Sequence, residues 1–538
     1  MNNLKGFEIV NGNLKKYRGR GTDVIVPDCV TSIGNNAFSE CKRLINVILP
    51  NSVTSIGECA FYDCKNLMSI TLPEGLMSIG ECAFHGCKGL TNIAIPNNVT
   101  KINRATFMGC ESLTAITIPN SVTSIDQRAF CNCRNLTSIK IPNSVANIGF
   151  EAFADCKNLT QIFIPNGVTS IGQGAFRECE QLKSIFVDEK NSAYKSISGN
   201  LYTIDGKNIL QYAVGKQDIS FAIPDGVTSI GQGAFRACKS LTNIIMPDSV
   251  TSISGTAFTQ CENLTSITIP DGTTNIGAFA FCGCKSLMRI TIPNSVSSIE
   301  CGTFAHCESL MSINIPDTVT SIGSNAFEGC KSLISTTIPN GVTNIGDWGF
   351  ANCENLTSIT IPDSMISIGK LAFSGCKKLA SVNIPTSITS VGLVAFAGCD
   401  SLISILADER NTSYKSIDGN LYTKNGKTLI QYAIGKQDNF FAIPDGVKNI
   451  APGAFVDCQN LTDIIITNSV TGIDDRAFFS CKHLTSVFYT GTRESLANIA
   501  IGNYNEGFRS ANVYFYSEDK PTQSDIFWHY VNGVPVVW

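Results

Sequence analysis

The chain has 538 residues, of which 43% are hydrophobic and only 16% are charged, and its formal net charge is −4. This composition excludes an intrinsically disordered chain, because enough apolar side chains are present to form a core. The small net charge and the absence of a basic block exclude nucleic acids and anionic membrane surfaces as expected partners.

The first predicted element is a hairpin in residues 7–17, where the sequence FEIVNGNLKKY places Asn-Gly between two short extended segments. Residues 1–10 lack the basic start and apolar core of a secretory signal peptide. No run approaches 18 apolar residues, so no membrane insertion is expected. Taken literally, these features predict a cytoplasmic protein.

A 23-residue repeat follows, and each copy carries a cysteine at the same phase. Seventeen of the 23 cysteines keep this spacing: Cys41, Cys64, Cys87, Cys110, Cys133, Cys156, Cys179, Cys238, Cys261, Cys284, Cys307, Cys330, Cys353, Cys376, Cys399, Cys458 and Cys481. A period of 20 to 29 residues with a Leu-x-x-Leu-x-Leu core is typical of leucine-rich-repeat solenoids. The expected fold is a β-rich α/β repeat solenoid, a right-handed superhelix with a parallel concave sheet.

Each repeat has the form L-x-x-I-x-I-P-[ND]-x-V-x-x-I-G-x-x-A-F-x-x-C-x-x. The alternation of Leu264, Ile267 and Ile269 predicts a strand with one buried face. Pro270 ends that strand, and 16 of the 19 prolines occupy the same phase. A second, shorter extended segment then carries Val and Ile inward, and A-F-x-x-C is expected to close the coil as a helical turn. Stacked coils bury the apolar side chains that a single coil would leave exposed.

Two near-duplicate insertions, residues 191–227 and 411–447, lie 220 residues apart and each lengthens one interval from 23 to 59 residues. Asp205-Gly206 and Asn425-Gly426 predict a hairpin in each. We expect both hairpins to lie against or beside the concave face. Their tyrosines, among them Tyr202 and Tyr422, then either bury apolar strand residues or border a binding groove.

The strand position four residues after the repeat leucine supports such a cover. It is mostly Thr, Asn or Lys within each array, but it becomes apolar beside a terminus or an insertion, at Ile48, Phe186, Ile245, Leu406, Ile465 and Phe488. Ala94 and Phe163 are apolar without lying at such an edge. The tail is expected to cap the last coil with a short helix at residues 493–501 and aromatic strands at 512–516 and 527–538.

No catalytic constellation is evident. The four histidines, His85, His306, His483 and His529, are scattered along the chain, and no nucleophile, phosphate-loop or zinc-protease motif occurs. No catalytic residue, metal site or cofactor is therefore expected. The ladder cysteines are interpreted as buried free thiols that pack as small apolar residues. Cys59 and Cys82 form the best local pair if any disulfide exists.

The signature I-P-[ND]-x-V-x-x-I-G-x-x-A-F-x-x-C, over about residues 20 to 490, resembles the BspA-like leucine-rich-repeat family of bacteria. The resemblance implies a cell-surface, adhesin-like or protein-interaction role, in conflict with the cytoplasmic expectation, so both compartments stay open.

The expected function is non-enzymatic protein binding, as an interaction scaffold or adhesin, by a monomer. The alternative is a glycan-binding module that uses the Thr-, Ser- and Asn-rich concave face. A purely structural explanation of these threonines is that Thr suits exposed strands. The candidate binding surface comprises Thr265, Ser266, Thr268, Thr357, Ser358, Thr360, Phe163, Tyr202 and Tyr422.

The expected domain organisation has seven segments. They are an N-terminal cap hairpin (1–22), a first repeat array (23–187), an inserted hairpin (188–221), a second array (222–407), a second inserted hairpin (408–441), a third array (442–490) and a C-terminal cap (491–538).

Overall fold

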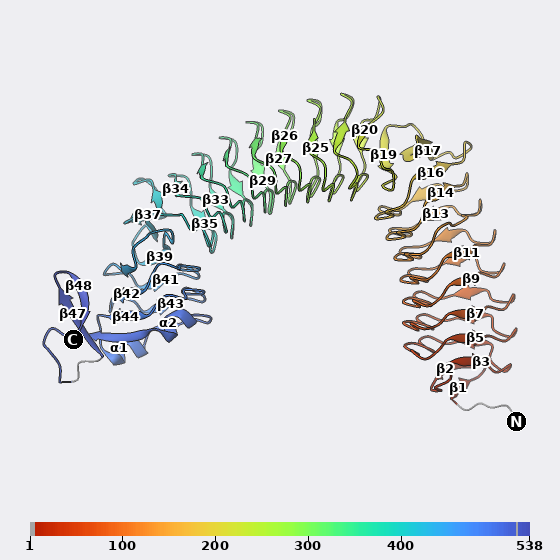
Figure 1. The fold of residues 1–538 in the computed structure, drawn as a ribbon, viewed down its shortest axis with the longest axis horizontal. Helices are drawn as coiled ribbons and strands as arrows, with labels where there is room; N and C mark the ends of the chain where they lie inside the picture. The colour runs from red at the N-terminus through yellow and green to blue at the C-terminus, as the bar shows by residue number, and fades with distance from the viewer. Residues whose placement is uncertain (1–5, 523–525) are drawn as a thin grey trace. The chain divides into compact units, whose positions relative to one another are not determined.

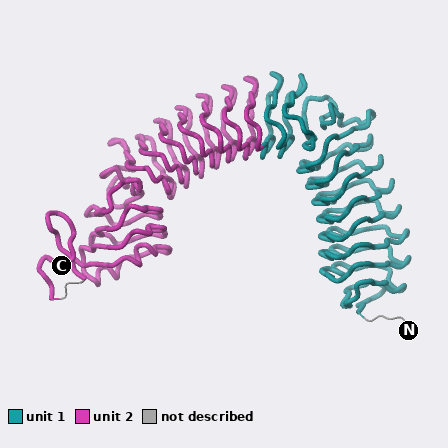
Figure 2. The backbone as a smooth tube through the Cα atoms, viewed as in Figure 1, with its two compact units in different colours: residues 1–261 teal, residues 262–538 magenta. Residues whose placement is uncertain are grey.

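The computed structural model describes residues 6–522 and 526–538 and divides into two compact units, residues 1–261 and 262–538 (Figure 2). In each unit, one repeat forms one coil and successive coils stack in parallel (Figure 1). Strands make up nearly all of the regular structure; in the described part of the chain, helices occur only in the C-terminal tail. The predicted β-rich leucine-rich-repeat solenoid is therefore confirmed.

Every regular coil contributes one strand to each of two rows. The long-strand row holds the x-I-x segment that follows the repeat leucine. In β26 (Arg289–Thr291) and β28 (Ser312–Asn314), Arg289 pairs with Ser312 and Ile290 with Ile313, 23 residues apart. Ile290 is buried and its two strand neighbours are exposed, as strand alternation requires. The short-strand row holds the two-residue segment that ends in the next inward isoleucine. Proline between the rows stops the first strand.

Long strands of the first unit are β3 (Asp23–Ile25), β5 (Asn46–Ile48), β7 (Ser69–Thr71), β9 (Asn92–Ala94), β11 (Ala115–Thr117), β14 (Gln161–Ile164), β16 (Ser184–Val187), β20 (Ser220–Ala222) and β22 (Asn243–Ile245). Its short strands are β4 (Ser32–Ile33), β6 (Ser55–Ile56), β8 (Ser78–Ile79), β10 (Lys101–Ile102), β12 (Ser124–Ile125), β13 (Asn147–Ile148), β15 (Ser170–Ile171), β21 (Ser229–Ile230) and β23 (Ser252–Ile253).

Long strands of the second unit are β24 (Ser266–Ile267), β26 (Arg289–Thr291), β28 (Ser312–Asn314), β30 (Ser335–Thr337), β32 (Ser358–Thr360), β34 (Ser381–Ile384), β36 (Ser404–Ala407), β40 (Phe440–Ala442), β42 (Asp463–Ile466) and β44 (Ser486–Tyr489). Its short strands are β25 (Asn275–Ile276), β27 (Ser298–Ile299), β29 (Ser321–Ile322), β31 (Asn344–Ile345), β33 (Ser367–Ile368), β35 (Ser390–Val391), β41 (Asn449–Ile450), β43 (Gly472–Ile473) and β45 (Ala500–Ile501).

The A-F-x-x-C segment differs from the helical turn that its sequence suggests. It is a chain of tight turns, in which the N–H of Cys87 donates to the carbonyl of Phe84 at 3.1 Å. The N–H of Phe84 instead reaches the carbonyl of Thr106 in the next coil, at 2.9 Å, so it cannot make a helical bond within its own coil. Two positions per coil have positive φ, here Cys82 (52°) and Gly86 (72°). Mostly non-glycine residues fill the first of them, which hides the pattern from sequence inspection.

The core is a ladder of buried phenylalanines and cysteines. Phe304 lies 5.7 Å from Phe281 and 5.6 Å from Phe327 between ring centroids, with nearly parallel planes. The thiol of Cys330 donates to the carbonyl of Phe304 at 3.3 Å. All 23 cysteines are free, and 17 of them are buried. The ladder thiols therefore pack as predicted and also supply a weak hydrogen bond to the preceding coil.

Hairpins begin the first unit and interrupt both. β1 (Phe7–Val10) and β2 (Asn13–Tyr17) pair antiparallel, as predicted, and the short-strand row continues from β2. The first insertion contains β17 (Tyr194–Ile197), β18 (Asn200–Thr203) and β19 (Asn208–Gln211). The second contains β37 (Tyr414–Ile417), β38 (Asn420–Thr423) and β39 (Thr428–Gln431). The predicted hairpins at Asp205-Gly206 and Asn425-Gly426 are the β18–β19 and β38–β39 pairs.

The tail closes the second unit with α1 (Arg493–Ala497), α2 (Glu506–Ser510), β46 (Asn512–Tyr516), β47 (Phe527–Val531) and β48 (Val534–Val537). α1 is shorter than the helix predicted for residues 493–501, because Ala500 and Ile501, the last two residues of that range, form β45 and pair with β43. Trp528 is fully buried, and its indole N–H donates to the carbonyl of Tyr489 at 3.1 Å. The tail therefore caps the core as expected.

Candidate binding surfaces

The outward side chains of the long-strand row are accessible in the second unit. Ser266 and Thr268 of one coil are exposed, as are Thr357, Ser358 and Thr360 of another, and Thr265 is half-buried. The hydroxyl of Thr357 donates to the carbonyl of Ile334 in the preceding coil at 3.2 Å. Thr at that phase therefore has a structural role, whereas the serine and the second threonine of each strand face outward.

Phe163 lies on the outward face of the long-strand row in the first unit. It pairs in parallel register with Phe186, and both side chains are 47% exposed. Lys140, in the preceding coil, forms an isolated parallel β-bridge with Phe163 through the backbone. These three residues form a ridge of two aromatic side chains and one ammonium group.

The structure corrects the predicted cover over the apolar strand residues. Ile48, Phe186, Ile245 and Leu406 are about half exposed or more, at 50%, 47%, 56% and 47%. The reason is that β2, β19 and β39 join the short-strand row, beside β4, β21 and β41, and leave the long-strand row uncovered. Of these six residues only Ile465 and Phe488 are covered, and Trp528 of the C-terminal tail, not an inserted hairpin, packs against them.

Tyr202 and Tyr422 are not exposed at a groove edge, which corrects both predicted roles for these side chains. Each has no exposed surface, because it projects from the middle strand of its insertion into the core. Their hydroxyl groups have no hydrogen-bond partner in the described chain. Burial raises the pKa of Tyr202 to about 12 and also raises the pKa of Tyr422. Tyr422 lines a cavity of 280 Å³ beside Asp418, Tyr432 and Phe440.

Other tyrosines of the insertions have clear structural roles that the sequence did not reveal. Tyr212 stacks on Phe235 with centroids 5.3 Å apart, so it restarts the phenylalanine ladder after the interruption. Tyr432 does the same with Phe455 at 4.9 Å. The insertion thus supplies a shortened coil of its own.

Exposed apolar side chains form a second ridge that sequence inspection missed. Met288, Met311 and Ile334 follow the repeat leucine in three successive coils and are 42%, 47% and 53% exposed. The N–H of Met311 donates to the carbonyl of Met288 at 3.3 Å, which places them on adjacent coils. The available signal was the apolar residue itself, at a position where threonine is the commonest residue.

The structure brings the four histidines to no common site. His85 and His529 are half-buried, whereas His306 and His483 are exposed on separate coils. Burial lowers the pKa of His85. Within residues 6–522 and 526–538, no group of three or more His, Cys, Asp or Glu side chains is placed to hold a metal ion. No helix in the same ranges is long and apolar enough to cross a bilayer.

The chain is similar to a leucine-rich cell surface protein of Faecalibacterium prausnitzii (29% identity, 64% of this chain, 89% of that chain, TM-score 0.45). It is also similar to a leucine-rich repeat protein of Bacteroides ovatus (28% identity, 74% and 94% covered, TM-score 0.45). No curated protein matches the chain.

The profile of the BspA type Leucine rich repeat region (6 copies) matches residues 16–135, 100–204, 207–334, 297–427 and 435–527. These ranges cover both repeat units and both insertions. The chain therefore belongs to the family of BspA-type leucine-rich-repeat proteins.

Proposed function

We propose that the protein is a non-enzymatic binding scaffold that holds a protein partner on the outward face of its long-strand row. The observation that carries this proposal is the pair of adjacent phenylalanines, Phe163 and Phe186, each 47% exposed on neighbouring strands. Aromatic side chains, phenylalanine among them, are enriched at the centres of protein interfaces. Surrounding hydroxyl and amide side chains provide the polar rim that such interfaces use.

The Phe163–Phe186 pair also favours a protein partner over a glycan bound across the hydroxyl-rich strands. Two phenyl rings remove apolar area from water when they are covered, and they offer no hydrogen bonds to sugar hydroxyls. The absence of any joint arrangement of the histidines supports a binding role rather than catalysis. The family of the chain is consistent with a repeat scaffold for binding.

The test is a quantitative pull-down from native lysate and from culture supernatant, with the wild type compared against Phe163→Ser/Phe186→Ser. Both side chains are half exposed, so the variant should keep its melting temperature and lose the specific partner. Met77→Ser, which removes an exposed apolar side chain beside the short-strand row, is the matched control and should retain it. A partner held equally by both variants, or one displaced by soluble glycan, would contradict the proposal.

A further inference from the structure

The first insertion leaves backbone donors of one coil without the acceptors that most coils find in their neighbour. The N–H of Glu151 donates to the carbonyl of Gln173 at 3.1 Å, and the N–H of Phe153 to that of Ala175 at 2.8 Å. One coil later the equivalent N–H groups belong to Gly174 and Phe176. Neither has an acceptor in the described chain, because the shortened coil of the insertion does not supply those carbonyls.

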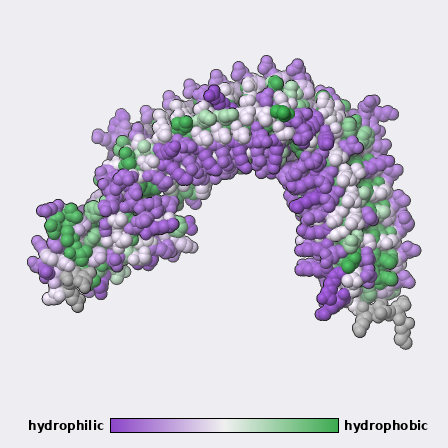
Figure 3. All heavy atoms as spheres, in the orientation of Figure 1, coloured by the Kyte–Doolittle hydropathy of each residue, from purple (hydrophilic) through white to green (hydrophobic). Residues whose placement is uncertain are grey.

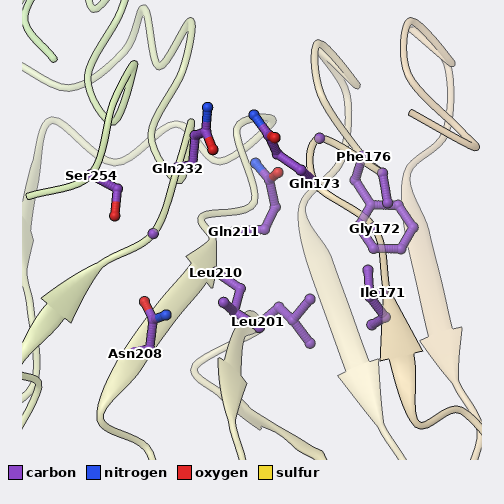
Figure 4. A pocket seen from close by; sticks show the side chains of 13 residues that line it. Ile171, Gly172, Gln173, Phe176, Leu201, Asn208, Leu210, Gln211, Gln232 and Ser254 are labelled. Carbon is purple, nitrogen blue, oxygen red and sulfur yellow. The ribbon is translucent and has the colours of Figure 1, made fainter. Parts of the chain in front are cut away.

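A cavity of 260 Å³ occupies this interruption (Figure 4). Phe176 and Leu201 are among its apolar lining residues, and the amide side chains of Gln173, Gln211 and Gln232 gather at its upper side in the view (Figure 4). None of its lining residues is charged.

Two polar side chains that line the cavity, Gln211 and Asn208, belong to the first insertion. Gln211 is 6% exposed and donates from its amide nitrogen to the carbonyl of Tyr212 at 2.9 Å. The amide oxygen of Asn208 is buried and has no partner in the described chain. A buried amide oxygen without a partner costs free energy unless a hydrogen-bond donor reaches it.

The second insertion provides an internal comparison, because its residues are displaced by 220 positions. Val394 stands where the first insertion has Gly174, and its Cγ1 atom lies 2.1 Å from where a Cβ atom would be on Gly453, so the valine reaches across the interruption. Leu393 likewise replaces Gln173. Gly174 leaves that space open, at φ 64°, while Val394 adopts φ 51° in the same position. The first interruption is therefore the open, amide-lined one.

We propose that this cavity binds the main chain of a short, uncharged peptide segment of the protein partner, and this inference rests on the proposed function. The N–H groups of Gly174 and Phe176 are equivalent to donors that other coils satisfy with two carbonyls two residues apart, so a peptide that presents two carbonyls in that arrangement can accept from both. The glutamine and asparagine amides both donate and accept, so they match peptide groups. A peptide segment that supplies both carbonyls forms the two backbone hydrogen bonds that the shortened coil leaves unmade.

Size and charge restrict the occupant further. A volume of 260 Å³ corresponds to about nine water molecules of ~30 Å³ each, enough for a segment of a few small residues and too little for a folded element. The charged side chains near the cavity do not line it. They form ion pairs with one another, since the carboxylate of Glu178 lies 3.4 Å from the guanidinium groups of both Arg177 and Arg236. A charged ligand therefore finds no counter-ion in the cavity.

The experiment pans a phage-displayed random heptapeptide library against the full-length wild type and against Gly174→Val, which copies the closed geometry of the second insertion. Peptides of low charge should be enriched on the wild type and bind Gly174→Val about tenfold or more weakly, through loss of two backbone hydrogen bonds. Hydrogen exchange of residues 171–178 should slow when an enriched synthetic peptide is added. Gln173→Leu, an exposed substitution copied from Leu393, repeats the test in case the valine variant folds poorly.

Three results would overturn the inference: no enrichment, equal binding to the wild type and to both variants, or binding only of a saccharide probe such as tri-N-acetylchitotriose. Phe163→Ser/Phe186→Ser should still bind the heptapeptides. If peptides bind as described while the pull-down shows no dependence on the two phenylalanines, the proposed surface fails and the cavity stands. If the pull-down depends on them and the library yields nothing, the cavity alone fails.

Discussion

The hydroxyl oxygen of Tyr194 accepts a hydrogen bond from the backbone N–H of Ile171 at 2.9 Å. Ile171 ends β15, the last short strand before the first insertion, so the tyrosine replaces a missing backbone acceptor. Tyr414 accepts from the N–H of Val391 at the same distance in the second insertion. A side chain thus closes the short-strand row wherever an insertion interrupts it.

Tyr194→Phe should destabilise the coil before the first insertion by about 1 kcal/mol, because it leaves the Ile171 N–H without its partner. Hydrogen exchange at the Ile171 amide should accelerate. Tyr202→Phe is the matched control, since the Tyr202 hydroxyl is buried without a partner and its removal should be neutral or stabilising. Equal effects of the two changes would contradict this role for Tyr194.

Thiol accessibility should divide the cysteines sharply. Cys29 is exposed and should react first with a thiol reagent, followed by the half-buried Cys41, Cys59, Cys82, Cys282 and Cys301. Burial raises the pKa of Cys59 to about 11 and of Cys64 to about 12, so little reactive thiolate forms at neutral pH. The remaining thiols should react only after denaturation. Peptide mapping of the labelled protein checks the order.

Alkaline pH should destabilise the fold progressively. Burial raises the pKa of Cys330 to about 12 from an ordinary value of 9.0. The unfolded state therefore releases this proton first, and stability that is complete below pH 9 falls as pH rises toward the folded value. Each such thiol should contribute about 1.4 kcal/mol per pH unit within that window. Urea titrations of the wild type and of Cys330→Ala should show the smaller slope in the variant; identical slopes would exclude the thiol as the cause.

Phe304→Ala should cost about 3–5 kcal/mol, because it removes a fully buried ring from the middle of the ladder. The loss should spread to the adjacent coils, since each coil is stabilised by its neighbours. Met311→Ala, in the same coil but 47% exposed, serves as the control and should change the melting curve little. An unchanged curve for the phenylalanine variant would contradict the assigned core.

Trp528→Ala should destabilise the last coils by about 3–5 kcal/mol, because the indole lies 5.5 Å from the ring of Phe488 and is fully buried. Hydrogen exchange should accelerate in β42 and β44 and stay unchanged in β26. The comparison is Trp348→Ala, which removes an indole that is 37% exposed. A comparable loss from the exposed tryptophan would argue against a capping role for Trp528.

The elements that follow from local patterns could be predicted from the sequence. Alternation around Ile267 gives its strand, Pro270 gives the end of that strand, and Asp205-Gly206 gives a hairpin, because each depends on residues close together in the chain. The stacking of coils follows from the constant period. The turn conformation of A-F-x-x-C did not follow, because its N–H groups bond to the next coil.

The surroundings of the insertions could not be predicted, because they depend on which row the inserted strand joins. β19 pairs with β21 in the short-strand row, Phe186 stays exposed on the long-strand row, and Tyr202 lies in the core. Likewise, the free donors of Gly174 and Phe176 arise from acceptors that a shortened neighbour lacks. Neither residue differs from its counterparts in other repeats in a way that reveals this.

The interruption between Phe176 and Tyr212 also has a mechanical consequence for the first unit. Elsewhere in that unit, stacked rings and regular backbone hydrogen bonds join each coil to the next. Both are interrupted here, and the Arg236–Glu178 ion pair is one of the remaining contacts. When the unit is stretched along its axis, the first coils to separate should be those on either side of this position. The force required should fall with rising salt concentration, because ions screen that pair.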